Sequence, residues 1–340
     1  MNNNKVIITG GLGFIGSNLI KSLLRRKFHI YNFDKLSKQS SLKFFFYKDK
    51  NYNFKKIDLS KISNNKLTKI IKIINPRFII NLASETHVDR SIDSPEEIIR
   101  SNIISLTNLL VSVKNLDYRK EKIKFIHLGT DEIFGDIPFK SKKKFKEDSP
   151  IMPNNPYSAS KASQIHIIKA FCHTYKLKYI IINPSNNYGP YQFPEKFIPK
   201  SIMKIFSNKP VEIYGKGKNI RNWIYVEDTV EAIIKIMRVG RLNNIYNISS
   251  SNLISNNNLI KKIFKHMNIK NVNIKYVFDR PGHDEKYSSD SQKLKNLGWK
   301  EKYSFDQGIT KTISWYLKNE NLKQFCSKKI NLKRLGKIKK

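Results

Sequence analysis

A short apolar segment followed by closely spaced glycines opens the chain and limits what it can fold into. Lys5–Thr9 has the composition of a buried strand, and Gly10, Gly13 and Gly16 lead from it into a helix predicted at Ser17–Arg26. Glycines at these positions let the backbone turn tightly, approach a pyrophosphate and pack the helix on its strand. The helix N-terminus then presents the positive end of its dipole to the phosphates. Strand, glycines and helix in this order predict a dinucleotide-binding site.

The next two predicted strands end in carboxylates. Asp34 follows the strand His29–Phe33, and an acid there can hydrogen-bond the ribose 2′-hydroxyl and would repel a 2′-phosphate. NAD is therefore favoured over NADP, although a carboxylate that only caps a turn also fits the sequence. Asp58 and Leu59 follow a third strand that ends at Ile57, and we expect them to face the adenine.

Strands and helices continue to alternate along the first half of the chain. Helices are predicted at Leu67–Ile74 and Glu96–Lys114, and strands at Arg77–Ala83, Lys124–Leu128 and Tyr179–Asn183. A polar loop, Ser84–Ser91, is predicted after the first of these strands. This alternation predicts an α/β fold with a doubly wound parallel Rossmann sheet.

The regular alternation ends near residue 184, which suggests how the chain is divided. We expect residues 1–184 to form the NAD-binding Rossmann domain, with a later segment at about 222–248 returning to it. Residues 185–320 are expected to form mainly a second, smaller substrate-binding lobe. Residues 321–340 are expected to be a basic tail.

A hydroxyl and two carboxylates follow the apolar strand Lys124–Leu128. Thr130, Asp131 and Glu132 are predicted to lie in a loop at the end of that strand. The carboxyl ends of strands are where open α/β sheets place their chemistry, although a solvated polar turn would have the same composition.

A tyrosine and a lysine share one face of a later helix. Asn155 and Pro156 are typical of a helix start, which places Tyr157 and Lys161 at positions i and i+4. A nearby ammonium group stabilises a tyrosinate, as a redox enzyme requires. Tyr-x-x-x-Lys is common by chance, but behind a dinucleotide fingerprint it indicates a catalytic pair.

The chain is strongly basic. Lys and Arg number 64 against 27 Asp and Glu, which gives a net charge of +37. Such a charge attracts polyanions. The lysines are nevertheless spread over every predicted helix face and are dense only in Lys328–Lys340, which we expect to be mobile. We therefore expect an anionic small-molecule substrate and no specific nucleic-acid partner.

Other compositional features suggest where the protein works. No apolar run approaches the roughly 18 residues that span a membrane. The N-terminus leads directly into a strand, so no signal peptide is expected. Cys172 and Cys326 lie far apart and outside any metal-ligand spacing. We expect no disulfide framework, no metal site, no membrane association and a cytoplasmic location.

Several segments resemble a known family. They are Glu85–Ser91, Thr130–Glu132, Tyr157–Lys161, Ser185–Pro190 and Asp279–His283. On these residues the chain is similar to the extended short-chain dehydrogenase/reductase family, and within it to the dTDP-glucose 4,6-dehydratases, over roughly residues 4 to 318. It departs from their pattern at Gly129, where Ser is usual, at Phe134, where Tyr is usual, and at Asn222, where Asp is usual. The connection between Gly135 and Ser149 is also rich in lysine.

The resemblance implies an NAD-dependent loss of water from dTDP-glucose. Tyr157, as tyrosinate supported by Lys161 and the positive nicotinamide, would take the C4 hydroxyl proton while Thr130 hydrogen-bonds the same oxygen. Glu132 would then remove the C5 hydrogen, and Asp131, kept protonated by burial, would protonate the departing C6 hydroxyl. We expect the last two side chains to point apart on an extended backbone. The family also suggests a homodimer.

The motifs and the resemblance together predict the binding residues. The cofactor set is Gly10, Gly13, Phe14, Ile15, Gly16, Asp34, Asp58, Leu59, Leu82, Ala83, Ser84, Tyr157, Lys161 and Asn187. The substrate set is Thr86, Thr130, Asn186, Glu195, Lys196, Arg221, Asn256, Asp279, Arg280 and His283. Arg221 and Arg280 are the candidates for the diphosphate, because a guanidinium fork matches its geometry.

Two other functions share part of this pattern. A nucleotide-sugar 4-epimerase or a UDP-glucuronate decarboxylase would also have the glycines, Asp34, Tyr157 and Lys161. An epimerase needs no acid–base pair at 131 and 132, which ranks it second. A catalytically dead relative that binds RNA would be expected to have lost Tyr157 or Glu132, and the chain has both.

Overall fold

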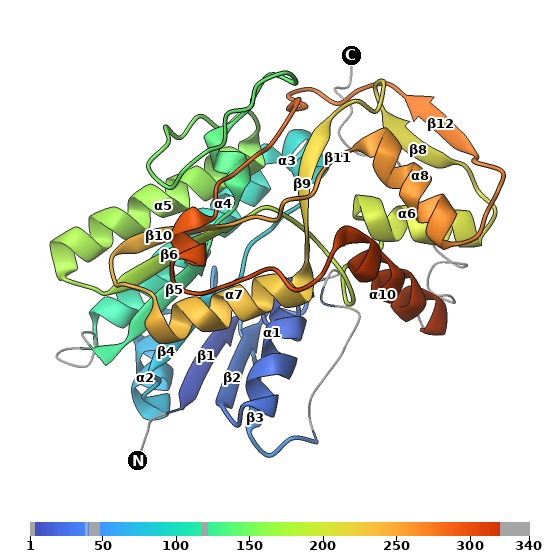
Figure 1. Ribbon diagram of the computed structural model, residues 1–340. Helices are drawn as coiled ribbons and strands as arrows, with labels where there is room; N and C mark the ends of the chain where they lie inside the picture. The colour runs from blue at the N-terminus through green and yellow to red at the C-terminus, as the bar shows by residue number, and fades with distance from the viewer. Residues whose placement is uncertain (1–3, 38–39, 41–47, 117–121, 320–340) are drawn as a thin grey trace.

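A seven-stranded parallel sheet forms the centre of the molecule in the computed structural model, which describes residues 4–37, 40, 48–116 and 122–319 (Figure 1). The strand order is β10-β6-β5-β4-β1-β2-β3, and every pair is parallel. The strands are β1 (Lys5–Thr9), β2 (His29–Asp34), β3 (Tyr52–Lys56), β4 (Phe78–Asn81), β5 (Lys124–Leu128), β6 (Tyr179–Pro184) and β10 (Asn244–Ile248). The predicted doubly wound Rossmann sheet is therefore confirmed.

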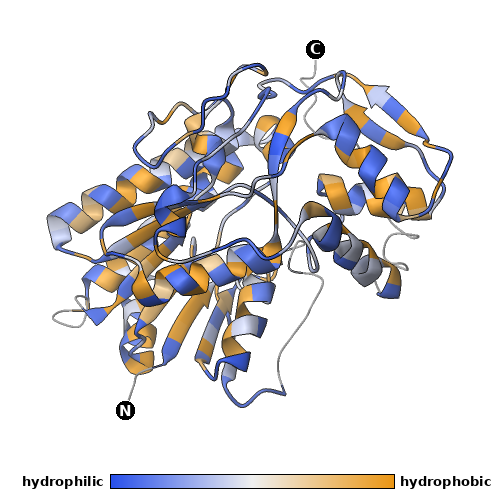
Figure 2. Cartoon of the chain, viewed as in Figure 1, coloured by the Kyte–Doolittle hydropathy of each residue, from blue (hydrophilic) through white to orange (hydrophobic). Residues whose placement is uncertain are grey.

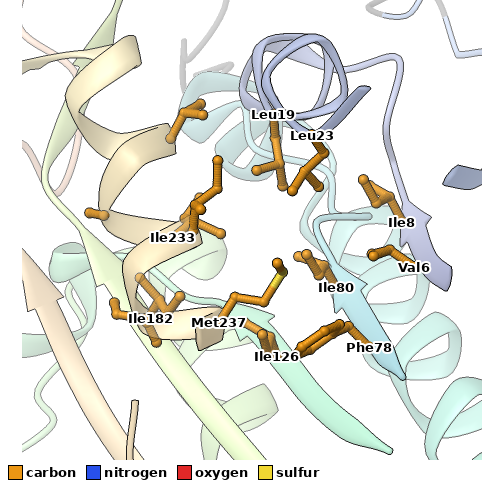
Figure 3. Close-up of a cluster of buried hydrophobic side chains, with 14 of the residues drawn as sticks. Val6, Ile8, Leu19, Leu23, Phe78, Ile80, Ile126, Ile182, Ile233 and Met237 are labelled. Carbon is orange, nitrogen blue, oxygen red and sulfur yellow. The ribbon is translucent and has the colours of Figure 1, made fainter. Parts of the chain in front are cut away.

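Helices cover both faces of this sheet, which explains why its strands are almost continuously apolar. One face packs on α1 (Phe14–Arg25) and α7 (Val226–Val239), whose Leu19, Leu23, Ile233 and Met237 belong to one hydrophobic cluster with Val6 and Ile8 (Figure 3). The other face, which includes Ile7, packs on α2 (Asn64–Ile74), α4 (Pro95–Lys114) and α5 (Pro156–Tyr175). Figure 2 shows these strands as mostly hydrophobic, whereas the helices also carry hydrophilic residues.

A second group of elements, which we call the small lobe, has a hydrophobic core of its own. Its core includes Ile202, Ile213, Leu259 and Ile313. One of its sheets has the strand order β11-β9-β7, and another pairs β12 with β8 (Figure 1). The elements are β7 (Asn186–Tyr188), α6 (Phe197–Phe206), β8 (Val211–Tyr214), β9 (Ile220–Tyr225), β11 (Leu253–Ser255), α8 (Asn256–His266), β12 (Ile274–Val277) and α10 (Phe305–Lys318).

Two segments predicted as loops contain short helices. The 3-10 helix η3 (Asp131–Phe134) follows β5, and the Thr130 side chain caps it by accepting a hydrogen bond from the Glu132 N–H. The helix α3 (Val88–Asp93) begins inside the predicted polar loop, where His87 caps it by accepting from the Arg90 N–H. Both predictions were wrong because a single capping side chain is enough to start a helical turn.

The remaining expectations about targeting and cysteines are tested only in part. No helix of the described residues is long and apolar enough to cross a membrane. Cys172 is buried and forms no disulfide with any described residue. Cys326 and the basic tail lie outside the described residues.

Candidate active site

The carboxyl ends of three neighbouring strands bring the predicted functional segments to one edge of the sheet. The glycine segment follows β1, Leu82–Thr86 follows β4, and Thr130–Glu132 follows β5. The order β5-β4-β1 makes these segments neighbours. This edge is where open α/β sheets bind their ligands.

The glycine segment forms a cradle that has no room for side chains at three of its positions, Gly10, Gly11 and Gly16. Gly10 has φ +69°, and a Cβ there would lie 2.7 Å from the Cα of Ala83. A Cβ at Gly16 would lie 2.6 Å from the carbonyl oxygen of Gly10. A Cβ at Gly13 would meet only that same oxygen, at 3.1 Å, so its remaining surroundings are open. This arrangement fits a pyrophosphate held against the first turn of α1, which contains Phe14 and Ile15.

Asp34 fastens this cradle to the end of β2. Its Oδ2 accepts a hydrogen bond from the Leu12 N–H (3.0 Å), and its Oδ1 accepts from the Leu36 N–H (2.8 Å) and the Ser40 hydroxyl (3.0 Å). The carboxylate is buried, and the turn-capping role that the sequence left open is present. A carboxylate oxygen can accept two hydrogen bonds, so Oδ2 can also receive a ribose hydroxyl.

The predicted adenine-facing residues lie next to this end of the sheet. Asp58 accepts hydrogen bonds from the Ser60 N–H (3.0 Å) and hydroxyl (2.6 Å). Partial burial alone would raise the pKa of Asp58, but these hydrogen bonds and the charges of Lys35 and Lys61 together lower it. Leu59 is buried, and its carbonyl accepts from the Asn108 side chain (2.8 Å).

Asp131 and Glu132 occupy a buried turn, which changes their ionisation. Burial, followed by the charge of Glu132, raises the pKa of Asp131 well above its usual range. Burial also raises the pKa of Glu132, against the opposing charges of Arg280 and Arg221. Asp131 Oδ2 and Glu132 Oε2 are buried and have no hydrogen-bond partner among the described residues. The two side chains leave a 3-10 turn, so the expectation that an extended backbone points them apart was wrong.

Tyr157 and Lys161 lie in the first turns of α5 beside this acidic pair. Burial, the charge of Glu132 and that of Asp131 raise the pKa of Tyr157, and a hydrogen bond with Thr130 opposes the rise. Burial lowers the pKa of Lys161 to about 7, and its ammonium donates to the Leu128 carbonyl (2.7 Å). The chain alone therefore favours a neutral tyrosine, and the positive charge of an oxidised nicotinamide would act in the opposite direction.

Residues predicted to bind the substrate approach the same turn from the small lobe. Arg221 donates to the carbonyls of Ile220 (2.9 Å), Asp284 (2.9 Å) and Glu285 (3.3 Å). Its guanidinium also stacks on Tyr287, 4.3 Å from the ring centroid. These contacts fix its orientation near Glu132 and Asp131.

The Asp279–His283 turn lies nearby. The Asp279 carboxylate binds the His283 ring (2.5 Å) and the Arg280 N–H (2.8 Å). Burial and the charges of Arg280 and Arg221 lower the pKa of His283 to about 4. The imidazole is therefore neutral at physiological pH.

Other predicted residues make contacts within the chain. Glu195 pairs with Arg90, and Lys196 donates to the Thr86 carbonyl (2.6 Å). The side-chain oxygens of Asn186 and Asn187 are buried and accept no hydrogen bond within the described part of the chain.

Three further predictions concern positions on other elements. Asn256 starts α8, and its N–H donates to the Asn219 carbonyl (3.0 Å). Ala83 donates weakly through its N–H to the Thr9 hydroxyl (3.4 Å), and the Ser84 hydroxyl donates to the Glu85 carbonyl (3.3 Å). None of these contacts identifies a ligand, so the binding roles of Asn256, Ala83 and Ser84 stay predictions.

Comparison with known proteins gives the family. Residues 7–312 match the family described as GDP-mannose 4,6 dehydratase. The chain is also 36% identical over 331 residues to a dTDP-glucose 4,6-dehydratase of Xanthomonas campestris, covering 92% of this chain and 93% of the relative. The chain belongs to the 4,6-dehydratase family that the match over residues 7–312 describes.

Solved structures of the family and of its neighbours share the fold. A dTDP-glucose 4,6-dehydratase of Streptomyces venezuelae, crystallised with NAD bound, superposes with a TM-score of 0.85 at 29% identity over 93% of this chain and 98% of its own. A UDP-glucose 4-epimerase of Thermotoga maritima superposes with a TM-score of 0.82 at 25% identity over 92% of this chain and 99% of its own. Fold alone therefore does not separate a dehydratase from an epimerase.

The departures from the dehydratase pattern have local explanations. A Cβ at Gly129 would collide with Asn183 Oδ1, so Ser does not fit there without movement of that amide. Asn222 donates to the Ser250 carbonyl (2.7 Å), which an Asp cannot do. Phe134 stacks on Phe145 at 5.3 Å and thereby anchors the lysine-rich connection. None of these changes replaces Asp131 or Glu132.

One residue missed by the sequence reasoning ties this dehydratase site together. Asn102, on α4, donates to the Glu85 carbonyl (3.1 Å) and accepts from the Glu85 N–H (2.8 Å). It also donates to the Ser160 hydroxyl (2.9 Å), and Ser160 donates to the Tyr157 carbonyl (2.7 Å). The signal in the sequence was a polar residue among the buried positions of an amphipathic helix.

Replacing Asp131 with Asn is expected to stabilise the fold. Because the folded pKa of Asp131 is raised, its stabilising contribution is present below the unfolded value and is lost as pH rises through the folded value. The melting temperature of Asp131→Asn should therefore exceed that of the unaltered protein by a margin that grows from about pH 4 upward.

Asp58→Asn is the matched control, because the pKa of Asp58 is lowered. A lowered pKa stabilises the folded protein above the unfolded value, so this variant should gain nothing at neutral pH. A melting-temperature difference for Asp131→Asn that does not change with pH would contradict a raised pKa at this position.

Proposed function

We propose that this chain is an NAD-dependent dTDP-glucose 4,6-dehydratase, a hydro-lyase that forms dTDP-4-keto-6-deoxyglucose. The observation that carries the proposal is the pair of buried Asp131 and half-buried Glu132 beside Tyr157, at the ligand-binding edge of a Rossmann sheet. The names of the relatives and the NAD bound in a structural neighbour support the same activity.

The first half of the reaction is oxidation at C4. Tyr157 takes the proton of the C4 hydroxyl, and Thr130, which hydrogen-bonds Tyr157, steadies the same oxygen. NAD, when bound, would supply the acceptor for the hydride that leaves C4. Its reduced form would supply the hydride that is added to C6 after water has been eliminated. Lys161 stabilises the tyrosinate from one turn further along α5.

The second half is elimination of water across C5 and C6. The C4 ketone acidifies the C5 hydrogen, and Glu132 removes it as a base. Asp131 gives a proton to the departing hydroxyl, which requires a carboxyl that is protonated near neutral pH. Its raised pKa favours the protonated form, while Arg280 and Arg221 keep the pKa of Glu132 lower than burial alone would leave it.

Other residues of the site are assigned to binding the cofactor or the nucleotide sugar. We infer that the cradle from Gly10 to Gly16, with Asp34, holds the cofactor. The buried acceptors of Asn186 and Asn187 and the guanidinium groups of Arg221 and Arg280 are suited to the cofactor and the nucleotide sugar.

We also propose the setting in which the enzyme works. Residues 1–184, with about 222–248, would bind NAD, and 185–320 would mainly bind the sugar nucleotide. Ile99 and Ile104 are exposed on α4, which supports burial of that helix in a homodimer. A cytoplasmic location without membrane association, and the absence of a specific nucleic-acid partner, complete the proposal.

Incubation with dTDP-, UDP-, GDP- and CDP-glucose, followed by mass measurement of the products, tests the activity. We expect loss of one water, fastest from dTDP-glucose and without net consumption of NAD. A product of unchanged mass from every substrate, as an epimerase gives, would falsify the proposal.

A further inference from the structure

A buried carboxylate on α3 joins the Rossmann sheet to the small lobe. Asp89 is 8% exposed. Its Oδ1 accepts a hydrogen bond from Arg280 Nη1 (2.9 Å), and its Oδ2 accepts from the Tyr214 hydroxyl (2.8 Å). Tyr214 ends β8, and Arg280 follows β12, so both partners belong to the small lobe. With both oxygens engaged, the carboxylate has a fixed orientation.

The guanidinium that Asp89 holds has unused hydrogen-bonding capacity. The side chain of Arg280 is only 15% exposed. Its Nε is buried and has no hydrogen-bond partner among the described residues. Burying a donor without a partner is costly, so such a group in a native protein requires an explanation, and a ligand that accepts from it is one.

The surroundings of Arg280 indicate where that ligand lies. The charge of Arg280 lowers the pKa of Glu132, so this guanidinium acts electrostatically on the turn that holds the two carboxyls. The neighbouring Asp279 does not pair with this guanidinium, because its carboxylate accepts from His283 and from the Arg280 N–H. One edge of Arg280 is therefore fixed by Asp89, and Nε is left for an anion near the active site.

We propose that Asp89 is a positioning residue, which holds Arg280 in the orientation that receives the diphosphate of the nucleotide sugar. This inference rests on the proposed function, because it takes a nucleoside diphosphate as the ligand. A long arginine side chain loses much rotamer freedom when it binds, and holding it in place beforehand removes that cost from the binding step.

A charge effect alone would have the opposite sign. Asp89 neutralises Arg280, so removing the carboxylate without disturbing the guanidinium would strengthen its attraction for a diphosphate. Positioning predicts weaker binding instead. The sign of the change therefore separates the two explanations.

The experiment measures binding of dTDP and of thymidine to the NAD-loaded protein. In Asp89→Asn, the affinity for dTDP should fall by about 10- to 100-fold, while that for thymidine, which has no phosphate, stays the same. The KM for dTDP-glucose should rise by a similar factor, and kcat should change much less. Asp148→Asn, which removes an exposed carboxylate outside these contacts, is the charge-matched control and should change neither affinity.

A double-mutant cycle keeps the test independent of any loss of stability. In an Arg280→Gln background, Asp89→Asn should weaken dTDP binding no further, because its effect acts through Arg280. Stronger binding of dTDP, equal weakening of dTDP and thymidine, or an undiminished further loss in that background would each overturn the inference. Unaltered protein that binds dTDP without dehydrating dTDP-glucose would instead contradict the proposed function and leave this test in place.

Discussion

Glu132→Gln should yield an enzyme that reduces NAD when dTDP-glucose is added but releases almost no product. Glutamine keeps the shape of the side chain and cannot take the C5 proton. Loss of a general base costs about 100- to 10,000-fold, so turnover should collapse by that factor. In the proposed mechanism, oxidation at C4 depends on Tyr157 and Lys161, so the absorbance of reduced nicotinamide should accumulate, and the C5 hydrogen should exchange only slowly with deuterated water.

The same variant should shift the pH dependence of the first half-reaction. The charge of Glu132 is the second cause, after burial, that raises the pKa of Tyr157. Removing this charge lowers that pKa, so tyrosinate forms at lower pH. NAD reduction by Glu132→Gln should therefore extend to more acidic pH than single-turnover reduction by the unaltered enzyme.

Asp148→Asn, an exposed change in the connection before α5, is the control and should leave turnover unchanged. Turnover of Glu132→Gln within a few-fold of the unaltered enzyme would show that Glu132 is only part of a polar turn. The dehydratase mechanism would then lose its base.

Tyr157→Phe should suppress both halves of the reaction. The variant lacks the hydroxyl that takes the C4 proton in the proposed mechanism, and the hydride cannot leave C4 efficiently while that proton stays. We expect a loss of about 100- to 10,000-fold in turnover, this time without accumulation of reduced nicotinamide. Stopped-flow absorbance in a single turnover measures both quantities.

Tyr276→Phe removes the hydroxyl of an exposed tyrosine on β12 and serves as the control. NAD reduction by Tyr157→Phe at the rate of Glu132→Gln would contradict the role of Tyr157. The contrast between the two variants is more informative than either loss alone, because a general loss of structure would suppress both signals in both proteins.

The sequence was most informative where local patterns decide the structure. The apolar run of β1, the glycines and the helix after them predicted the cradle, and β5 has the predicted bounds, Lys124–Leu128. Strands buried on both faces are continuously apolar and therefore easy to find. The short helices η3 and α3 were missed, since each depends on one side chain capping a turn in a polar segment.

Contacts between distant segments could not be predicted in this way. Asp89 and Arg280 are separated by 191 positions, and neither segment has a pattern that requires the other. The link from Asn102 through Ser160 to Tyr157 likewise depends on how α4 packs against α5. The ionisation of Asp131 depends on burial, which the sequence suggested only through the resemblance.

The origin and destination of the transferred hydrogen test the central claim most directly. With dTDP-glucose carrying deuterium at C4, the account predicts a product lighter by one water that has the deuterium at C6, because hydride leaves C4 and returns to C6 on the same protein. Mass and NMR measurements of the isolated product give both answers in one experiment. A product of unchanged mass, or a dehydrated product with solvent hydrogen at C6 and no deuterium, would contradict it.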